Sequence, residues 1–464
     1  MSAPLPAHPP AVSAAAGSGA ATIVAVATPL GRGGLGVVRV SGERARAIVE
    51  QVLGQPCAEP RRVRRVTWRD PLDGALLDDV LVTFFAAPHS YTAEDVVEIS
   101  GHGAPVLLRA LVEALCRAGA RLAEAGEFTR RAFLNGRLDL TQAEAIRDLI
   151  DSQTLLQART AAQQMHGGVA RQVGPIQQAL REVIARMEAG IDFADDDVAV
   201  PATAGLRAGL DRVQERLAPL RASFRHGRLL QQGLSLALVG RPNVGKSSLF
   251  NRLLASERAI VTPTPGTTRD VLAETLDLDG VPVRLLDTAG LRTSEDAIER
   301  EGVARAWQAL GEADLVVAVF DASRPLGPDD DRLLQHLRAM PQALLVLNKV
   351  DLPRRLAAGE LAEAVPVSAL HGTGVEALRD RVRQRVLPEL GMAGSWITNA
   401  RQAACLDRAA QHVERGGDAV TAGLPHEMVL LDLYAGLREL DALSGQTTVD
   451  DILEVIFATF CVGK

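Results

Sequence analysis

Nine residues near the middle of the chain have the types and spacing that hold phosphate. Residues 240–248 read GRPNVGKSS, match the pattern GxxxxGK[ST], and follow the apolar run 234–239. In a strand, loop and helix of this kind, backbone N–H groups cradle the α- and β-phosphates of a nucleotide. Lys246 would reach the β- and γ-phosphates, and the Ser247 hydroxyl would bind Mg²⁺. The motif alone is also compatible with a glycine-rich turn, so the segments that follow it must show whether a nucleotide site is present.

Three later segments each follow an apolar run. Residues 287–290 (DTAG) follow 281–286, residues 348–351 (NKVD) follow 343–347, and residues 368–370 (SAL) follow 364–367. An acid in the first can hold Mg²⁺ through water, and the Gly290 N–H can meet the γ-phosphate. Asp351 can accept both N–H groups of guanine, which adenine does not offer. Because ligands of open α/β sheets bind at the carboxyl ends of strands, the order predicts a Ras-like P-loop GTPase domain over residues 233–385.

Composition limits the other possibilities. A chain of 464 residues is long enough for about three domains. The net charge of −7 and only 15 aromatic residues (10 Phe, 3 Trp, 2 Tyr) argue against an extended basic or stacking surface, so any nucleic-acid contact must be a local patch. The four cysteines have no CxxC spacing, which favours free thiols in a reducing cytosol over disulfides or a zinc site.

The chain carries no pattern typical of membrane insertion or secretion. Residues 1–20 contain no Lys or Arg and no continuous apolar core, so we expect a disordered tail and not a secretory signal. No stretch approaches the roughly 18 to 20 uncharged apolar residues of a membrane span. We therefore expect a soluble cytoplasmic protein.

Residues 21–135 show a mixed α and β pattern. Apolar runs predict strands at 23–27, 37–40, 80–85 and 96–99, and helical periodicity covers 44–53 and 105–118. The glycine-rich segment 31–36 has no Lys-Ser after it and leads into a strand, so we interpret it as a tight turn and not a second phosphate cradle. His102 is interpreted as a hydrogen-bonded histidine near a helix start, with ligand binding as the alternative.

Long helices are predicted on either side of the GTPase segment. Residues 136–232 and 386–464 are expected to form one all-helical domain, into which the GTPase domain is inserted. Helical runs are predicted at 140–189, which contains few helix-breaking residues apart from Gly167, Gly168, Gly174 and Pro175, and at 206–232, 398–422, 425–443 and 449–460. The acidic cluster at 192–197 is interpreted as a solvated turn, although its run of carboxylates resembles a metal site.

Four stretches together resemble the MnmE (TrmE) family of tRNA-modification GTPases. They are residues 31–36 (GRGGLG) with Arg39, residues 126–135 (GEFTRRAFLN), the inserted GTPase segment, and the terminal residues 460–464 (FCVGK). The resemblance covers essentially everything after residue 20. It implies an α+β N-terminal domain that binds a folate such as 5-formyltetrahydrofolate and forms a homodimer. It also implies a heterotetramer with the flavoprotein MnmG. Together the two proteins would add an aminomethyl or carboxymethylaminomethyl group to C5 of the wobble uridine (position 34) of certain tRNAs.

The resemblance also suggests how GTP is hydrolysed. Leu291 stands where a Ras-type site has its water-orienting Gln, and an alkyl group cannot orient water. In the family a K⁺ ion takes the place of an arginine finger when two GTPase domains meet, and Asn243, Thr262, Thr264 and Thr267 match its ligands. Glu299 matches the catalytic acid, Lys246 is also assigned a catalytic role, and Ser247 and Thr268 match the Mg²⁺ ligands. Arg269 and Arg292 remain alternative arginine fingers.

The resulting set of predicted GTP-binding residues spans five segments. They are Asn243, Val244, Gly245, Lys246, Ser247 and Ser248; Thr262, Pro263, Thr264, Pro265, Gly266, Thr267 and Thr268; Asp287, Thr288, Ala289 and Gly290; Asn348, Lys349, Val350 and Asp351; and Ser368, Ala369 and Leu370.

A folate site and a reactive thiol are implied in the same way. Arg39, Glu98, Arg137 and Lys464 are the predicted folate contacts, with Arg137 standing where the family usually has Lys. Arg can grip a glutamyl carboxylate and Glu98 can accept from the pterin amino group. Cys461 is predicted to be catalytic, because a thiol near cations is more ionised and more reactive; an inert terminal thiol is the alternative.

A second function stays open at this stage. The chain could be a pure GTPase switch in ribosome assembly or signalling, with a conformational change as its output. Such a switch has no use for a folate-like N-terminal domain or a terminal cysteine, and this favours the tRNA-modifying enzyme.

Overall fold

The computed structural model describes residues 21–29, 31–192, 203–255, 275–278, 280–286, 313–338, 340–356, 361–386, 396–446, 450–461 and 463. The chain forms two compact units, and both are assembled from separated stretches. The first comprises Met1–Arg147, Gln164–Val213 and Arg408–Lys464, and the second comprises Asp148–Gln163 and Gln214–Asp407. The boundary between the units falls within helices, so the domain limits at 20, 135, 232 and 385 stay predictions.

A six-stranded sheet forms the N-terminal part of the first unit, in the order β3-β4-β5-β2-β1-β6. Neighbouring strands are antiparallel except β1 and β6, which are parallel. Along β3 the buried residues Val66 and Trp68 alternate with exposed ones, which is the period of a sheet with one covered face. The strands are β1 (Ile23–Val26), β2 (Gly33–Ser41), β3 (Val63–Arg69), β4 (Leu76–Phe85), β5 (Val96–Gly103) and β6 (Arg121–Leu122).

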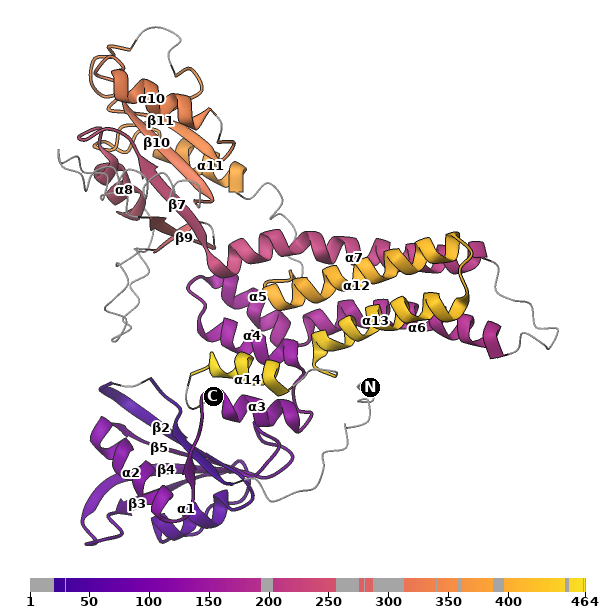
Figure 1. Cartoon of the computed structure of the whole chain (residues 1–464). Coiled ribbons are helices and arrows are strands. Elements are labelled where there is room, and N and C mark those ends of the chain that lie inside the picture. The colour runs from indigo at the N-terminus through magenta and orange to yellow at the C-terminus, as the bar shows by residue number, and fades with distance from the viewer. Residues whose placement is uncertain are drawn as a thin grey trace, which may run out of the picture. The chain divides into compact units, whose positions relative to one another are not determined.

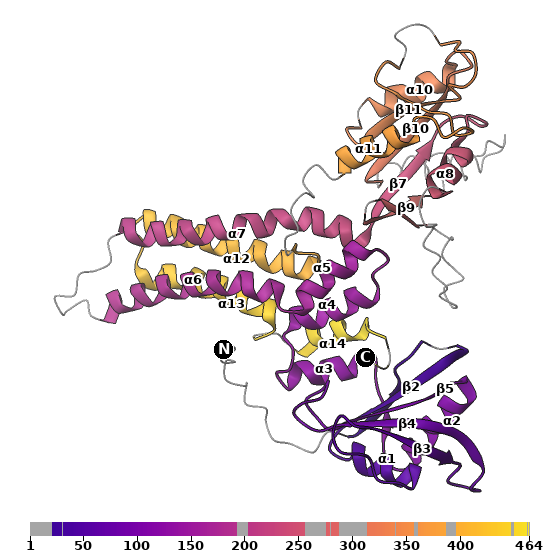
Figure 2. The same ribbon diagram turned by 180° about the vertical axis from the view of Figure 1, so that it is seen from behind.

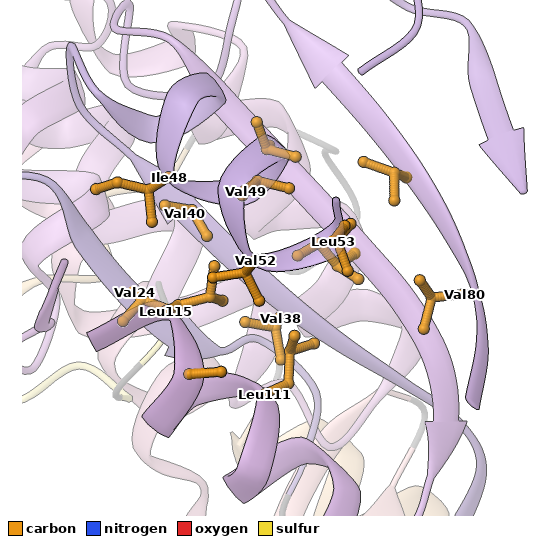
Figure 3. Packing of buried hydrophobic residues seen from close by; sticks show 14 of the residues in the cluster. Val24, Val38, Val40, Ile48, Val49, Val52, Leu53, Val80, Leu111 and Leu115 are labelled. Atoms are coloured by element: carbon orange, nitrogen blue, oxygen red, sulfur yellow. The ribbon is translucent and has the colours of Figure 1, made fainter. Parts of the chain in front are cut away.

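Helices α1 (Ala45–Leu53) and α2 (Pro105–Arg117) cover that face. Their apolar stripes meet the inward valines of the sheet in one core, and Figure 3 shows Ile48, Val49 and Val52 of α1 close to Val38 and Val40 of β2. Strand β2 extends back to Gly33, so the tight turn predicted over 31–36 is limited to the residues before it. His102 belongs to β5, where its Nδ1 lies 2.6 Å from Asp78 Oδ1.

The C-terminal helix packs on the N-terminal part of the chain within this unit. Helix α14 (Asp450–Ala458) lies against α3 (Glu127–Leu134), and the rings of Phe457 and Phe133 are 6.4 Å apart. Leu453 and Phe457 of this helix and Phe460 just after it are buried in one apolar cluster. Packing therefore holds Phe457 and Phe460 beside Gly126.

Long helices form the rest of the first unit and continue into the second. Helices α6 and α13 pack side by side in both views (Figures 1 and 2). Helix α6 runs through Pro175, a residue that removes one backbone hydrogen bond from a helix, and it packs against α13. The helices are α4 (Leu140–Ile150), α5 (Leu155–Met165), α6 (Gly168–Asp192), α7 (Thr203–Gln232), α12 (Ala400–Thr421) and α13 (His426–Ser444).

The second unit contains the other sheet, in the order β12-β11-β10-β7-β9-β8. All neighbours are parallel except the β8–β9 hairpin. Apolar cores lie on both faces, one including residues of α8 and α11 and the other including residues of α10. The elements are β7 (Leu234–Val239), α8 (Lys246–Ala255), β8 (Thr275–Leu278), β9 (Val281–Leu286), β10 (Leu315–Asp321), α10 (Pro328–Leu337), β11 (Ala343–Asn348), β12 (Val365–Pro366) and α11 (Val375–Val386).

The start of α5 anchors this sheet within the second unit. Thr154 Oγ1 donates to the carbonyl of Gly280 in the β8–β9 turn at 2.5 Å. Gln157 Nε2 donates to the carbonyl of Leu230 at the end of α7 at 2.8 Å, and both side chains are buried. Because β7 follows α7 directly, these bonds hold the strand that leads into residues 240–248.

The elements match the predicted fold class: an α+β N-terminal part, long helices, and a P-loop α/β sheet inserted between α7 and α12 (Figure 1). Among the residues described, no helix is both long enough and apolar enough to span a membrane.

Two glycines allow a test of the packing between α14 and α3. Gly126 and Gly136 have φ of +65° and +68°, but only Gly126 is crowded: a Cβ there would lie 2.6 Å from the Phe457 carbonyl oxygen. We expect Gly136→Ala to cost about 1–2 kcal/mol through positive φ alone. Gly126→Ala should cost about 1–3 kcal/mol more, because α14 must also move.

Amide hydrogen exchange of residues 450–460 measures that difference. Gly126→Ala should speed their exchange at least about tenfold relative to Gly136→Ala. Equal exchange in the two variants would show that α14 does not depend on this contact.

Candidate nucleotide-binding site

The loop between β7 and α8 has the backbone of a phosphate cradle. Gly240, Asn243 and Gly245 take φ of 144°, 63° and 97°, which turns successive N–H groups toward one side. Asn is one of the few residues other than Gly that adopts such angles readily. At Gly245 a Cβ would lie 2.2 Å from Asn348 Nδ2, so only glycine fits beside the next segment of the site.

Lys246 brings a positive charge into this loop. Its Nζ donates to the carbonyls of Gly240 at 2.7 Å and Arg241 at 2.8 Å. Burial lowers the pKa of Lys246, because the ammonium group has lost part of its hydration. A cation held this way is well placed to accept an anionic phosphate as a partner.

Asn348 joins three of the segments that the sequence singled out. Its Nδ2 donates to the Val244 carbonyl of the P-loop at 2.8 Å, and its Oδ1 accepts from the Ala369 N–H of the SAL segment at 3.0 Å. The side chain is buried, and each bond satisfies a polar group that lies away from water. The P-loop, the NKVD segment and the SAL segment are therefore brought together, as predicted from their order in the sequence.

These segments surround a cavity of about 550 Å³. Asp351 lies at its wall, and a hydrogen bond involving Ser368 holds the pKa of this carboxyl below its usual value. An ionised carboxylate only accepts hydrogen bonds, which suits the N1 and N2 donors of guanine. The cavity is lined by Gly245, Ser248, Asn251, Arg252, Asn348, Lys349, Asp351, Leu352, Ala369 and Leu370.

Lys349 is held by an acid that the sequence analysis missed. Its Nζ donates to Asp321 Oδ2 at 2.6 Å. Burial alone would raise the pKa of Asp321, but hydrogen bonds from Lys349 and Ser323 lower it. Asp321 ends β10, a strand pattern of six apolar residues before an acid, and that signal was available in the sequence.

Part of the predicted site lies outside the described residues. This holds for residues 262–268, which carry Thr262, Thr264, Thr267 and Thr268, and for residues 287–290. It also holds for Glu299, Arg269, Arg292 and Lys464. Of the two predicted Mg²⁺ ligands, Ser247 is described and is the second residue of α8. In the described part of the chain, no three His, Cys, Asp or Glu residues form a group that could hold a metal ion.

The structure brings Arg39 and Glu98 together on neighbouring strands β2 and β5. Arg39 Nε and Nη2 both donate to Glu98 Oε1, at 3.0 and 2.8 Å. The guanidinium also lies 5.0 Å from the Tyr91 ring centroid and 5.8 Å from that of Phe128, two residues that sequence reasoning missed. Aromatic residues scattered in the sequence carried no signal of this stacking.

Arg137 and Cys461, which were also predicted to act here, contact other residues. Arg137 Nε donates to the Ser90 carbonyl at 3.1 Å. Cys461 is an exposed free thiol, and its carbonyl accepts from Gly126 N–H at 3.4 Å. Gly463 adopts φ +100° close to β1, where a Cβ would lie 2.3 Å from the Val26 carbonyl oxygen.

Comparison with known proteins agrees with this architecture. A family model described as GTP-binding protein TrmE N-terminus matches residues 22–137, and one described as MnmE helical domain matches residues 140–461. Era, crystallised with MgGDPNP and a segment of 16S ribosomal RNA, covers 39% of this chain and 66% of its own at 25% identity and a TM-score of 0.27. At this TM-score the likeness adds nothing to the assignment.

Two relatives match the chain almost from end to end. The tRNA modification GTPase MnmE of Koribacter versatilis is 50% identical over 449 residues, covering 96% of this chain and 99% of its own length. That of Symbiobacterium thermophilum is 43% identical over 457 residues, covering 96% and 100%. With both family models in place and identity at this level over nearly the whole chain, the chain belongs to the MnmE (TrmE) family of tRNA modification GTPases.

Proposed function

We propose that this chain binds and hydrolyses GTP in the P-loop cavity and takes part in modifying the wobble uridine (position 34) of certain tRNAs. One observation supports the nucleotide site above the others: Asn348 ties the P-loop, NKVD and SAL segments together around a cavity of about 550 Å³. Family membership supports tRNA modification as the process.

Most of the proposed contacts to GTP come from described residues. Backbone N–H groups of the P-loop and the Lys246 ammonium meet the phosphates, and Asp351 reads the N1 and N2 edge of the base. Mg²⁺, with Ser247 and Thr268 as proposed ligands, would neutralise charge on the β- and γ-phosphates. Fixed positive charge of this kind stabilises the transition state of phosphoryl transfer.

A monovalent cation is the proposed substitute for an arginine finger. Leu291 cannot orient the attacking water, so Glu299 is proposed to do so through a bridging water. Asn243, Thr262, Thr264 and Thr267 are the proposed K⁺ ligands. The amide and carbonyl oxygens of such a loop are the hard ligands that an alkali cation prefers. Asn243 is positioned in the P-loop at φ 63°.

The N-terminal part is the proposed folate site and homodimer contact, and the flavoprotein MnmG is the proposed partner in a heterotetramer. Arg39 and Glu98 form a half-buried pair stacked on Tyr91 and Phe128. Both Arg39 bonds use Oε1 of Glu98, and Oε2 is proposed to accept from a pterin amino group. Arg137 and Lys464 are proposed contacts for the ligand's carboxylates, and 5-formyltetrahydrofolate or a related folate is the proposed donor.

Replacing Asp351 tests base recognition. The side-chain amide of Asp351→Asn can donate a hydrogen bond, whereas the carboxylate only accepts. The amide therefore pairs less well with the two guanine N–H donors, but it can donate to the oxygen that xanthine carries at C2. GTP affinity should fall by roughly ten- to a hundredfold while XTP affinity rises. Fluorescence titration with both nucleotides measures this, and an unchanged preference for GTP would remove Asp351 from the site.

The cation proposal is tested by comparing salts. GTP hydrolysis should be roughly ten- to a thousandfold faster in KCl than in NaCl at equal ionic strength, because one well-placed positive charge has an effect of this size. Asn243→Ala should abolish the difference between the salts. If the wild-type rates are equal, Arg269 and Arg292 become the candidates for an arginine finger.

Cys461 allows the tRNA function to be separated from GTP hydrolysis. Because Cys461 is exposed and lies far along the sequence from the P-loop, Cys461→Ser should leave GTP turnover within about twofold of wild type. If the thiol reacts, modified wobble uridine should fall at least about a hundredfold in a strain that relies on this variant. Mass spectrometry of tRNA nucleosides measures the product.

The strain lacking the protein is the control. Complementation by wild type with no gain in modified uridine would argue for the pure switch in its place. Normal modification by Cys461→Ser would make the thiol structural.

A further inference from the structure

Arg252, on the helix that follows the P-loop, grips the loop after β12 from one side. Its Nε donates to the carbonyl of Ala369 at 3.1 Å, and its Nη2 donates to the carbonyl of Leu370. The arginine and both of its partners line the nucleotide cavity. One guanidinium therefore holds two consecutive peptide groups of the SAL loop.

Holding a carbonyl also sets the direction of the next N–H. In a planar trans peptide, the C=O of one residue and the N–H of the following residue point opposite ways. The bond to the Ala369 carbonyl thus turns the Leu370 N–H away from Arg252. The bond to the Leu370 carbonyl sets the direction of the His371 N–H, which donates to Ser368 Oγ at 3.2 Å.

The two N–H groups at the centre of this loop are used differently. That of Ala369 donates to Asn348 Oδ1 at 3.0 Å. Among the described residues, no hydrogen bond donated by the Leu370 N–H is found. Residue Leu370 is 70% exposed, so this amide is not buried in a protein core. A backbone donor at the wall of a cavity needs water or a ligand as its partner.

We propose that Arg252 is a positioning residue for base selection, which aims the Leu370 N–H at the exocyclic oxygen O6 of guanine. Guanine presents an acceptor at this position, whereas adenine presents an amino group that would face the N–H with a second donor. Asp351 reads the opposite side of the same edge, at N1 and N2. This inference rests on the proposed GTP site and adds to it a residue that selects the base through the backbone.

The O6 contact is separated from the rest of binding by changing one atom of the ligand. In 6-thio-GDP a sulfur replaces O6 while the phosphates, N1–H and N2 amino group remain. Sulfur is a weak hydrogen-bond acceptor, so an aimed N–H favours GDP over 6-thio-GDP. The ratio of the two affinities reports the aim of the Leu370 N–H, whereas a general loosening of the loop lowers both affinities together.

The experiment titrates the full-length protein with GDP and 6-thio-GDP. Arg252→Met keeps the apolar stem and removes the donors, and Arg252→Lys keeps the charge but can serve the carbonyls only as a point donor. Arg381→Met, at an exposed position of α11, is the matched control for losing an arginine. We expect Arg252→Met to lower GDP affinity by roughly two- to tenfold and to lower the GDP to 6-thio-GDP ratio by about the same factor. Arg252→Lys should lie between it and wild type, with the control unchanged.

The outcomes are distinct. Equal losses for both ligands, in either Arg252 variant, would make Arg252 structural and overturn the inference, and so would GDP binding at the wild-type level with an unchanged ratio. A wild-type protein that binds neither ligand would overturn the proposed GTP site itself, and the inference with it.

Discussion

The buried amide of Asn348 is the contact on which the nucleotide site depends. It donates to the P-loop carbonyl of Val244 and accepts from the Ala369 N–H. These two loops follow β7 and β12, which are not neighbours in the sheet. A buried polar group left without its partner costs about 1–3 kcal/mol, so breaking either bond would leave two such groups. Gly245 completes the contact, because a Cβ there would overlap the amide.

Three cations around this site have different tasks because they have different partners. Lys246 rests on backbone carbonyls, which do not neutralise it, so its charge stays available to phosphate. Lys349 is paired with Asp321, which holds the lysine stem along the cavity wall. Arg252 uses its planar, forked donors on two carbonyls of one loop, a geometry that a lysine cannot copy.

Close packing also joins C-terminal residues to the N-terminal part of the first unit. Phe457 and Phe460 of the C-terminal segment pack beside Gly126 and Phe133, and the backbone of Cys461 bonds to Gly126. Gly463 then passes so close to the Val26 carbonyl that a side chain would not fit. These C-terminal residues are therefore held beside the N-terminal part that carries Arg39 and Glu98.

The sequence by itself determined the motifs and the elements whose apolar period is regular. The P-loop, NKVD and SAL segments were recognisable because phosphate and guanine each require particular residues at fixed spacing in a short stretch. Helices α1, α2 and α13 and strands β5 and β7 lie within a few residues of their predictions for the same local reason. Strand β3 was missed because arginines at 64, 65 and 69 interrupt its apolar pattern, and α3 because it is only two turns long.

Tertiary structure decided which distant residues meet. No repeating pattern in the sequence indicates that Lys349 pairs with Asp321 or that Arg39 stacks on Tyr91 and Phe128. The same holds for Arg252, which bonds to residues more than a hundred positions away. Helix α6 likewise continues through Pro175, because a partner helix stabilises what local propensity opposes. Local spacing specifies chemistry within a few residues, whereas contacts across the fold depend on how whole elements pack.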